Sequence, residues 1–599
     1  MAHSPVVIAL NRAGEATARR IATALGAPLH GREGRVAEAD AVFPNALTHI
    51  RDLFAAGVPV VGVCASGILI RAVAPLLADK TSEPPVLSVA DDGSVVVPLL
   101  GGHRGANRLA REISNVLNGK AAVTTAGDVA LGVALDEPPP GYRLQNPGDA
   151  KPVMAALLSG ACPCVTGENI FALDADDAGP VELAVTDAPL AGSATRLVYH
   201  PQAYVLGVGC ARNADPAELD ALVSDMLTEA YIAPGAIAAI ATLDLKADEP
   251  AMNALARKLG VPLILFTAAE LEAQTPRLAN PSDVVFAEVG THGVAEAAAL
   301  AAAENTVLAV EKRKSASATC ALGRAPGPIT SLNGRARGHL AIVGIGPGQS
   351  SWRTPEASRL IAEAEELVGY GLYIDLLGPL AAGKTRSDFP LGGEEDRCRY
   401  ALEKAAEGKR VALISSGDAG IYAMGALVFE LMDRGPDQMG VSDAARRVEV
   451  VSAPGVSALQ AAAARAGAPL GHDFCAISLS DLLTPREDIV RRLHAAAEGD
   501  FVIAFYNPVS LRRRTLLAEA RDILLAHRPA DTPVLLATSL GRPEENIRYR
   551  MLSELEVDEV DMLTVVLVGS SNSRLAHLGE GPRMYTPRGY ARKIDGDLA

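Results

Sequence analysis

The sequence predicts a multidomain α/β protein. Apolar, β-branched runs alternate along the whole chain with alanine-rich stretches whose apolar residues recur at helical spacing, a pattern typical of strands followed by helices. Examples are "VPVVGV" before "ILIRAVAPLL", "PLILF" before "AAELEAQ" and "RVALIS" before "YAMGALVFELM". Because 599 residues exceed the size of one hydrophobic core, we expect about three to five domains.

Two stretches rich in proline, glycine and charge interrupt this alternation. They are "LDEPPPGYRLQNPGDAKP" (135–152) and "GRAPGPITSLNGRARG" (323–338), and neither has a helical or strand period. Such composition predicts linkers. The chain is therefore expected to divide into three pieces at these two positions.

Composition argues against several classes of partner. A net charge of −16 and an aromatic content of 4% disfavour nucleic acid, since its binding proteins need a basic face and stacking rings. The 7 cysteines are scattered without a CxxC pair, which predicts neither a disulfide framework nor a metal site. The N-terminus lacks a basic targeting segment, and no run of about 18 apolar residues occurs. We expect a cytoplasmic protein with no membrane partner.

The segment "HLAIVGIGPGQSSWRTPEAS" predicts a strand, a glycine loop and a helix that begins at Thr354. A dinucleotide-binding loop needs its helix to start at once, so that free backbone N–H groups meet the phosphates. Here Pro347 removes one N–H group, and Gly348 lies well before Thr354. The loop of Gly344, Gly346 and Gly348 therefore predicts close approach to a ligand other than a dinucleotide.

Two further segments carry polar candidates. The strand "RVALIS" ends in "SSGDAG" (415–420), where small residues permit close approach of a ligand and Asp418 offers acceptors. The alternative is that Asp418 only caps the following helix. His472 and Asp473 follow a later alanine-rich helix, and a lone histidine of this kind is more often a surface or capping residue than a base.

A run of three arginines follows the strand "FVIAFY". Ser510 has the features of an N-cap, which would put Arg512, Arg513 and Arg514 in the first helical turn. Each cation there loses roughly 0.3–1 kcal/mol against the helix dipole, so a function is expected, and capture of substrate carboxylates is the simplest one. The alternative is an ordinary solvated run of charges.

A series of motifs from about 338 to 592 resembles the tetrapyrrole methyltransferases of cobalamin synthesis, most closely the precorrin-3B C17-methyltransferases. The motifs are GIGPG, "VGYGLY", "SSGDAGIYAMG", "APGVSALQAAAARAGAPLGHDF", "ISLSDLLTP", "YNP" and "VVLVGSSNS". The resemblance implies two α/β lobes, 339–452 and 453–592, with S-adenosylmethionine held between them. It also implies a tetrapyrrole (precorrin) substrate and a homodimer.

The resemblance further implies transfer of a methyl group to C17 of precorrin-3B and ring contraction to precorrin-4. We expect no metal ligands. The expected donor-binding residues are Ser416, Gly417, Asp418, Gly420, Ile421, Tyr422, Ser480, Asn507 and Pro508. The expected substrate-binding residues are Gly344, Gly346, Pro347, Gly348, Arg512, Arg513 and Arg514. The candidates for proton transfer during ring contraction are His472, Asp473, Ser480 and Asp481. Whether the substrate carries cobalt, or is another precorrin, stays open.

Residues 5–325 resemble the cobalt-precorrin-5A hydrolases, which open a lactone. The resemblance rests on "GILIRAVAPLLADKTSEPPVLSVADDGSVVVPLLGGHRGANRLAREI", "VLGVGCARNADPAELDALV", "IATLDLKADEPAMNALARKLGVPLILF" and "EKRKSASATCALGRA". It implies α/β domains over 1–135 and 204–325, a linker and central region over 136–203, and a linker over 326–338.

His103 is the candidate base of this half, at the mouth of a glycine loop before a helix N-terminus. In "VTTAGD", however, Gly127 replaces the usual second threonine of the hydrolases. Two alternatives stay open: His103 only stabilises its loop, or the whole half is a non-catalytic module that holds or hands over corrinoids.

Overall fold

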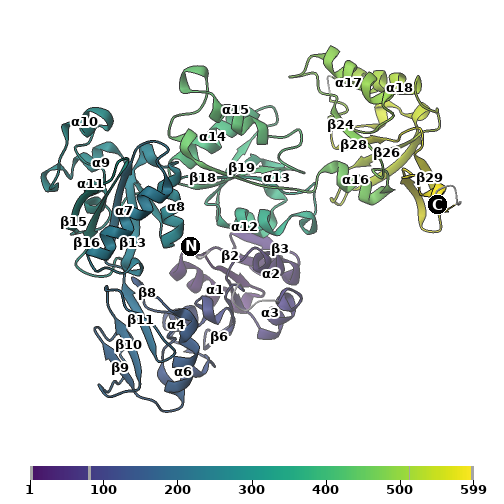
Figure 1. The fold of residues 1–599 in the computed structure, drawn as a ribbon. Helices are drawn as coiled ribbons and strands as arrows, with labels where there is room; N and C mark the ends of the chain where they lie inside the picture. Colours follow the sequence, from purple (N-terminus) through teal and green to yellow (C-terminus); the bar gives the residue numbers. More distant parts are fainter. Residues whose placement is uncertain (1–3, 78–82, 511–512, 595–599) are drawn as a thin grey trace.

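The computed structural model describes residues 4–77, 83–510 and 513–594. Every domain in Figure 1 combines a β-sheet with flanking helices, which confirms the predicted multidomain α/β class. Within the described residues, no helix is both long enough and apolar enough to span a bilayer.

The first domain has a seven-stranded sheet in the order β3-β2-β1-β4-β5-β6-β7. Its strands are β1 (Val6–Ala9), β2 (Leu29–Arg32), β3 (Ala41–Phe43), β4 (Val60–Val63), β5 (Val86–Val89), β6 (Val95–Leu100) and β7 (Lys120–Ala121). Its helices are α1 (Arg12–Leu25), α2 (Ala46–Ala55), α3 (Ser66–Val73), α4 (Ala106–Leu117) and α5 (Ala126–Leu131). Strands β1 to β5 pair in parallel, whereas β6 runs antiparallel to β5.

A second sheet, in the order β8-β11-β10-β9, corrects the first linker prediction. Its elements are β8 (Tyr142–Leu144), α6 (Ala150–Leu158), β9 (Pro163–Thr166), β10 (Val181–Val185) and β11 (Arg196–Pro201). Leu135 is fully buried in the core of this domain, and β8 pairs with β11. The stretch 135–152 is therefore structured, because its partners lie about 50 residues later, where local composition cannot reveal them.

The third domain has a six-stranded sheet in the order β15-β16-β12-β13-β14-β17. Its strands are β12 (Tyr204–Cys210), β13 (Ile237–Leu243), β14 (Leu263–Phe266), β15 (Val307–Lys314), β16 (Ala318–Arg324) and β17 (Arg335–Ala336). Its helices are α7 (Pro216–Glu229), α8 (Pro250–Leu259), α9 (Ala268–Glu272), α10 (Asp283–Val289) and α11 (Ala295–Ala301). The short strand β17 comes from the second predicted linker and pairs with β14, so that stretch is partly anchored.

The fourth unit, lobe 1, has an all-parallel sheet in the order β20-β19-β21-β18-β22. Its strands are β18 (His339–Gly344), β19 (Glu366–Tyr370), β20 (Thr385–Phe389), β21 (Arg410–Ser415) and β22 (Glu449–Ala453). Its helices are α12 (Pro355–Glu363), α13 (Gly371–Asp375), α14 (Glu394–Ala406) and α15 (Gly425–Asp433), with the short 3₁₀ turns η7 (Ser350–Trp352) and η8 (Gly378–Ala381).

The fifth unit, lobe 2, has a mixed sheet in the order β24-β25-β28-β26-β27 and a small sheet β23-β30-β29. Its strands are β23 (Gly467–Ala468), β24 (Phe474–Ser478), β25 (Val502–Tyr506), β26 (Pro533–Thr538), β27 (Asn546–Met551), β28 (Thr564–Val568), β29 (Arg574–Leu578) and β30 (Gly581–Tyr585). Its helices are α16 (Ala458–Ala466), α17 (Arg486–Glu498), α18 (Thr515–Leu525) and α19 (Tyr590–Ile594).

One hydrophobic core runs through both the first domain and lobe 1. Ile50, Leu53 and Phe54 of α2 belong to the same apolar cluster as Leu377 and Leu380 beside η8. Figure 1 shows helix α12 between the sheet of lobe 1 and the first domain. These two units therefore share buried surface, although more than 200 residues of chain separate them.

Candidate active site

Three loops meet at one edge of the lobe 1 sheet. They are 344–348 after β18, 416–420 after β21 and 454–455 after β22, and these strands are adjacent and parallel. Gly346 and Gly417 exchange backbone hydrogen bonds of 3.1 and 2.9 Å, and Ile345 N donates to Ser415 O at 3.0 Å. The carboxyl edge of the sheet thus carries a compact layer of backbone.

Glycine is required where these loops touch. A Cβ atom on Gly344 would lie 2.7 Å from Gly417 O and 2.9 Å from Gly455 N, and one on Gly455 would lie 2.0 Å from Gly417 O. The two glycines thus first serve loop packing. Gly417, with φ of +69°, needs glycine for its backbone conformation, yet an added Cβ would meet nothing closer than 3.9 Å. The open side of Gly417 is where a ligand can approach the backbone.

Asp418 ties two of the loops together. One carboxylate oxygen accepts from Gly420 N at 2.8 Å, and the other accepts from Gly455 N at 3.0 Å. The helix that follows, α15, begins only at Gly425 with Met424 as its N-cap. Asp418 is therefore not the cap of a helix, as one interpretation predicted, but the acceptor that fixes the shape of the layer.

The loops also reach lobe 2. Arg542 Nε donates to Pro347 O at 3.2 Å, and Tyr422 Oη donates to Ala476 O at 2.7 Å. Tyr422 holds a left-handed conformation, with φ of +51°, and its ring lies 5.2 Å from that of Tyr506. A non-glycine residue with this φ is uncommon, which indicates that the surrounding contacts fix the turn of Ile421 and Tyr422.

The facing edge of lobe 2 is formed by the ends of β24 and β25. Tyr506 Oη lies 2.5 Å from Ser457 Oγ and accepts from Leu459 N at 3.1 Å. Asn507, with φ of +49°, donates from Nδ2 to Ser478 Oγ at 3.1 Å. Tyr506 and Ser457 were missed as candidates, although both lie inside the "YNP" and "APGVS" motifs. The predicted residues Asn507, Pro508 and Ser480 lie at this same edge.

Arg513 and Arg514 lie before the helix and not inside it. Helix α18 begins at Thr515 with Arg514 as its N-cap, so the predicted placement in the first turn was wrong. Ser510 Oγ accepts from Arg513 N at 3.1 Å, which closes a separate turn that resembles a cap in sequence. Arg512 lies outside the described residues. The dipole argument for the run therefore does not apply.

The two described arginines have different surroundings. Arg513 donates to Ser480 Oγ, and its guanidinium lies 4.0 Å from Asp481. Arg514 donates to Val557 O at 3.1 Å and to Asp558 at 2.7 Å, away from the strand ends. Only Arg513 is thus joined to the predicted site.

The structure separates the four candidates for proton transfer into two pairs. Ser480 and Asp481 follow the carboxyl end of β24, whereas His472 and Asp473 precede its amino end. His472 Nδ1 accepts from Asp473 N at 2.8 Å, and both side chains are exposed. Only Ser480 and Asp481 are brought to the edge that carries Asn507.

In the first domain, the predicted strand, glycine loop and helix are present as β6, Gly101–Gly105 and α4. The side chain of His103 lies outside the described part of the structure. Arg104 N and Ala106 N both donate to Gly101 O, at 2.9 and 3.1 Å, and Gly105 N donates to Gly102 O. The amides of Arg104, Gly105 and Ala106 are therefore used by the turn that precedes α4.

A polar network lies beside this loop. Asn107 Nδ2 donates to Thr125 Oγ1 at 2.9 Å and to Asp128 at 2.8 Å, and Arg111 forms an ion pair with Asp128. A Cβ atom on Gly127 would lie 2.8 Å from the terminal methyl of Met154. Here Thr125 and Asp128 tie α5 to α4, and their hydrogen bonds are made within the domain.

Comparison with known proteins places these sites in families. Family models match three stretches: Cobalamin synthesis G N-terminal over 48–128, Cobalamin synthesis G C-terminus over 204–323, and Tetrapyrrole (Corrin/Porphyrin) Methylases over 339–556. A Sinorhizobium protein named precorrin-3B C(17)-methyltransferase is 45% identical over 255 residues, which make up 42% of this chain and 98% of that protein. The chain belongs to the tetrapyrrole methylase family.

Further relatives match the same methylase lobes. A probable cobalt-factor III C(17)-methyltransferase of Salmonella typhimurium is 45% identical over 251 residues, 42% of this chain and 99% of that protein. Among solved structures, the methyltransferase CobJ is 41% identical with a TM-score of 0.38, and the match covers 42% of this chain and 100% of that one. The family models over 48–128 and 204–323 show that cobalamin synthesis G domains precede the methylase lobes, as the motifs predicted.

Proposed function

We propose that the methylase lobes transfer a methyl group from S-adenosylmethionine to C17 of precorrin-3B, and that ring contraction to precorrin-4 follows at the same site. The observation that carries this proposal is the layer of three glycine-rich loops at the carboxyl edge of lobe 1, which faces the ends of β24 and β25. Membership of the tetrapyrrole methylase family supports the choice of reaction.

The residues present suit a sulfonium methyl donor. Backbone carbonyl groups and the Asp418 carboxylate give the layer acceptors for a cation, and the open side of Gly417 leaves room for it. The donor supplies an electrophilic methyl group: its carbon–sulfur bond breaks as the new carbon–carbon bond forms. The protein's part is to align the two carbons and to exclude water, so the fixed turn of Ile421 and Tyr422 is expected to position the donor.

Ring contraction requires proton transfer near the methylated carbon. Ser480 and Asp481 lie at the carboxyl end of β24, which supports them over His472 and Asp473 as the residues that transfer this proton. Arg513, which contacts Ser480, is expected to meet a substrate carboxylate from the same edge.

For the first half, two functions remain proposals. Opening of a corrinoid lactone follows from the resemblance of residues 5–325, with His103 as base. The use of the Arg104 and Ala106 amides by their own turn favours the alternative, a module that holds or hands over corrinoids without catalysis. We also propose a homodimer formed through the methylase lobes, which sedimentation at micromolar concentration tests.

The decisive experiment is turnover of precorrin-3B and of its cobalt form, side by side, with S-adenosylmethionine labelled in the methyl group. We expect label at C17 of a ring-contracted product from one of the two substrates. Label at another carbon, or none in either product, would contradict the proposal. In the same reactions, acetaldehyde released from a lactone-bearing intermediate, and lost in His103→Ala, would distinguish a hydrolase from a carrier.

A further inference from the structure

The first domain contains a cavity that none of the predicted sites includes. It has a volume of about 610 Å³ and lies at the ends of β1, β4 and β5, where Asn11, Ser66 and Asp91 line it. The loop Gly101–Gly105 is at the opposite edge of the sheet, because Gly101 lies beside Pro85 at the start of β5. The cavity is therefore separate from the predicted lactone site, and its volume is typical of small-molecule sites, which span about 300–1,000 Å³.

The strand order makes this position special. The chain leaves β1 toward β2 on one side of the sheet, whereas it leaves β4 toward β5 on the other side. Since β1 and β4 are neighbours, the two connections diverge and leave a crevice at the carboxyl ends of the strands. Ligands of open parallel α/β sheets bind in this crevice.

Two arginines lie at the cavity. Arg32 ends β2 and Arg35 lies in the turn after it, and neither guanidinium forms a hydrogen bond or an ion pair with any residue in 4–77, 83–510 or 513–594. Opposite them, α3 begins at Ser66 after Ala65, which offers no side-chain acceptor to the amides of the first turn. Both features favour an anionic group at this end.

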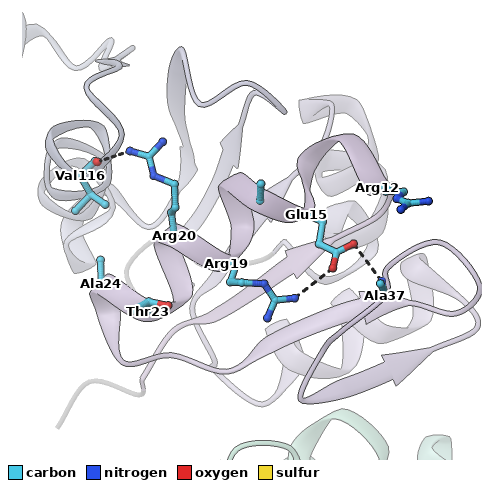
Figure 2. A pocket seen from close by; sticks show the side chains of 9 residues that line it. Arg12, Glu15, Arg19, Arg20, Thr23, Ala24, Ala37 and Val116 are labelled. Atoms are coloured by element: carbon cyan, nitrogen blue, oxygen red, sulfur yellow. Dashed lines mark hydrogen bonds and ion pairs between the residues drawn. The ribbon is translucent and has the colours of Figure 1, made fainter.

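A second hollow on the same domain can be compared with this cavity. Figure 2 shows this hollow, of about 800 Å³, on the outer side of α1, where Arg19 points to Glu15 and Arg20 points to the carbonyl of Val116. The corresponding contacts are 3.2 and 3.0 Å long. In that hollow Arg19 and Arg20 are held by partners within the protein, although Arg12 beside them forms no hydrogen bond or ion pair with a described residue. Among the described residues, neither Arg32 nor Arg35 of the cavity at β1 and β4 has such a partner.

The floor of the cavity is polar and already ordered. Asn11 accepts from Gly14 N at 2.8 Å and donates to Asp91 at 3.2 Å, while Ser88 Oγ donates to Cys64 O at 2.7 Å. Asp91 keeps acceptor capacity beyond its contact with Asn11. The floor thus suits a hydrogen-bond donor, and the arginine end suits a carboxylate.

We propose that this cavity binds one edge of a carboxylated tetrapyrrole, with a carboxylate side chain at Arg32 and Arg35. This rests on the proposed function, which supplies a macrocycle with carboxylate side chains. The first domain then has its own macrocycle site, apart from the methylase lobes and from His103.

The test uses the full chain with cobyrinic acid, a corrinoid with free carboxylate side chains, and follows backbone hydrogen exchange. We expect protection of 10–14, 30–36 and 64–68. The double variant Arg32→Gln with Arg35→Gln should need about ten times more cobyrinic acid, or more, for the same protection. This is the usual effect of losing charge-assisted hydrogen bonds. The matched variant Arg19→Gln with Arg20→Gln should bind as the parent does.

Three results would overturn the proposal: no protection of these segments in the parent protein, equal protection in the Arg32 and Arg35 variant, or equal protection by cobinamide, whose side chains are amides. Stronger protection by citrate would assign the cavity to small organic acids instead. Methyl transfer is measured separately. If it is absent while cobyrinic acid still protects the first domain, the proposed function fails and the tetrapyrrole cavity stands.

Discussion

Asp418 illustrates how much of the site depends on single residues. Its carboxylate accepts one backbone N–H from its own loop and one from the loop that follows β22. An asparagine would keep one acceptor oxygen and would turn an N–H₂ group toward the other N–H. For Asp418→Asn we expect donor affinity to fall by roughly 1–3 kcal/mol, the usual effect of an unsatisfied buried contact, when measured by calorimetric titration with S-adenosylmethionine.

The matched control is Asp437→Asn, which removes the charge of an exposed residue remote from the loops. Affinity in this variant should equal that of the parent. If Asp418→Asn also leaves affinity unchanged, the layer of loops does not bind the donor.

A histidine pair in the first domain makes stability depend on pH. His30 Nδ1 and His49 Nε2 lie 2.8 Å apart, and both rings are buried. Burial lowers the pKa of His30 to about 4 and, with the neighbouring His30, that of His49 to about 3. Since the unfolded state binds protons first, the stability is fully present above about pH 6.5 and is lost as pH falls from there.

The expected loss is about 1.4 kcal/mol per pH unit for each histidine between about pH 6 and pH 5. Urea unfolding of the parent and of His30→Leu with His49→Leu, over this range, measures it. The variant should be less sensitive to acid by this amount. Equal slopes in the two proteins would mean that the pair takes up its protons in the folded state.

At the scale of elements, the segment between β25 and α18 shows which structural features the sequence predicts and which it does not. Ser510 does accept a backbone N–H three residues later, as an N-cap would, so the local signal was real. The helix nevertheless begins only at Thr515, because Asn507 has a left-handed backbone conformation and the hydrogen bond from Arg513 N to Ser510 Oγ closes a separate turn before it. A sequence pattern predicts the contact but does not tell a turn from a first helical turn.

The same segment predicts different effects for neighbouring arginines. Arg513→Gln should raise the tetrapyrrole KM about tenfold, because Arg513 contacts Ser480 at the strand ends and a lost charge-assisted hydrogen bond is worth about 1.5–3 kcal/mol. Arg514→Gln should change KM little, since Arg514 is joined to the exposed Asp558. Steady-state kinetics with saturating donor measures both. Equal effects would return the run to a general electrostatic role.

Other elements agree with the sequence wherever the signals are local. Thr354 caps α12 through a hydrogen bond from Ala357 N, where the start of a helix was predicted, and β18 ends at Gly344 and β21 at Ser415, inside the stretches of small residues that marked the strand ends. The pairing of loops across 344–348, 416–420 and 454–455 was out of reach, since it depends on strand order. For the same reason the separation of His472 from Ser480 across β24 became visible only in the fold.

At the scale of the whole molecule, the shared core predicts one folding unit from the first domain and lobe 1. Leu53→Ala in α2 and Leu377→Ala beside η8 should each cost about 2–5 kcal/mol and lower the same calorimetric transition, because both side chains are buried in one cluster. Leu219→Ala belongs to the separate core of the third domain and should act on a different transition. Independent transitions for Leu53→Ala and Leu377→Ala would show that the two units fold separately.

The shared core also bears on how the two lobes of the methylase could move relative to one another. Lobe 1 packs against the first domain through the shared core, whereas lobe 2 lies beyond lobe 1, at the far end of the molecule in Figure 1. If the two lobes separate, residues 453–592 would move relative to the combined unit of the first domain and lobe 1. This movement would break the hydrogen bonds from Tyr422 to Ala476 and from Arg542 to Pro347. Both hydrogen bonds start in the loops that we propose hold the donor, so a separation of the lobes that admits the macrocycle would also alter the proposed donor site.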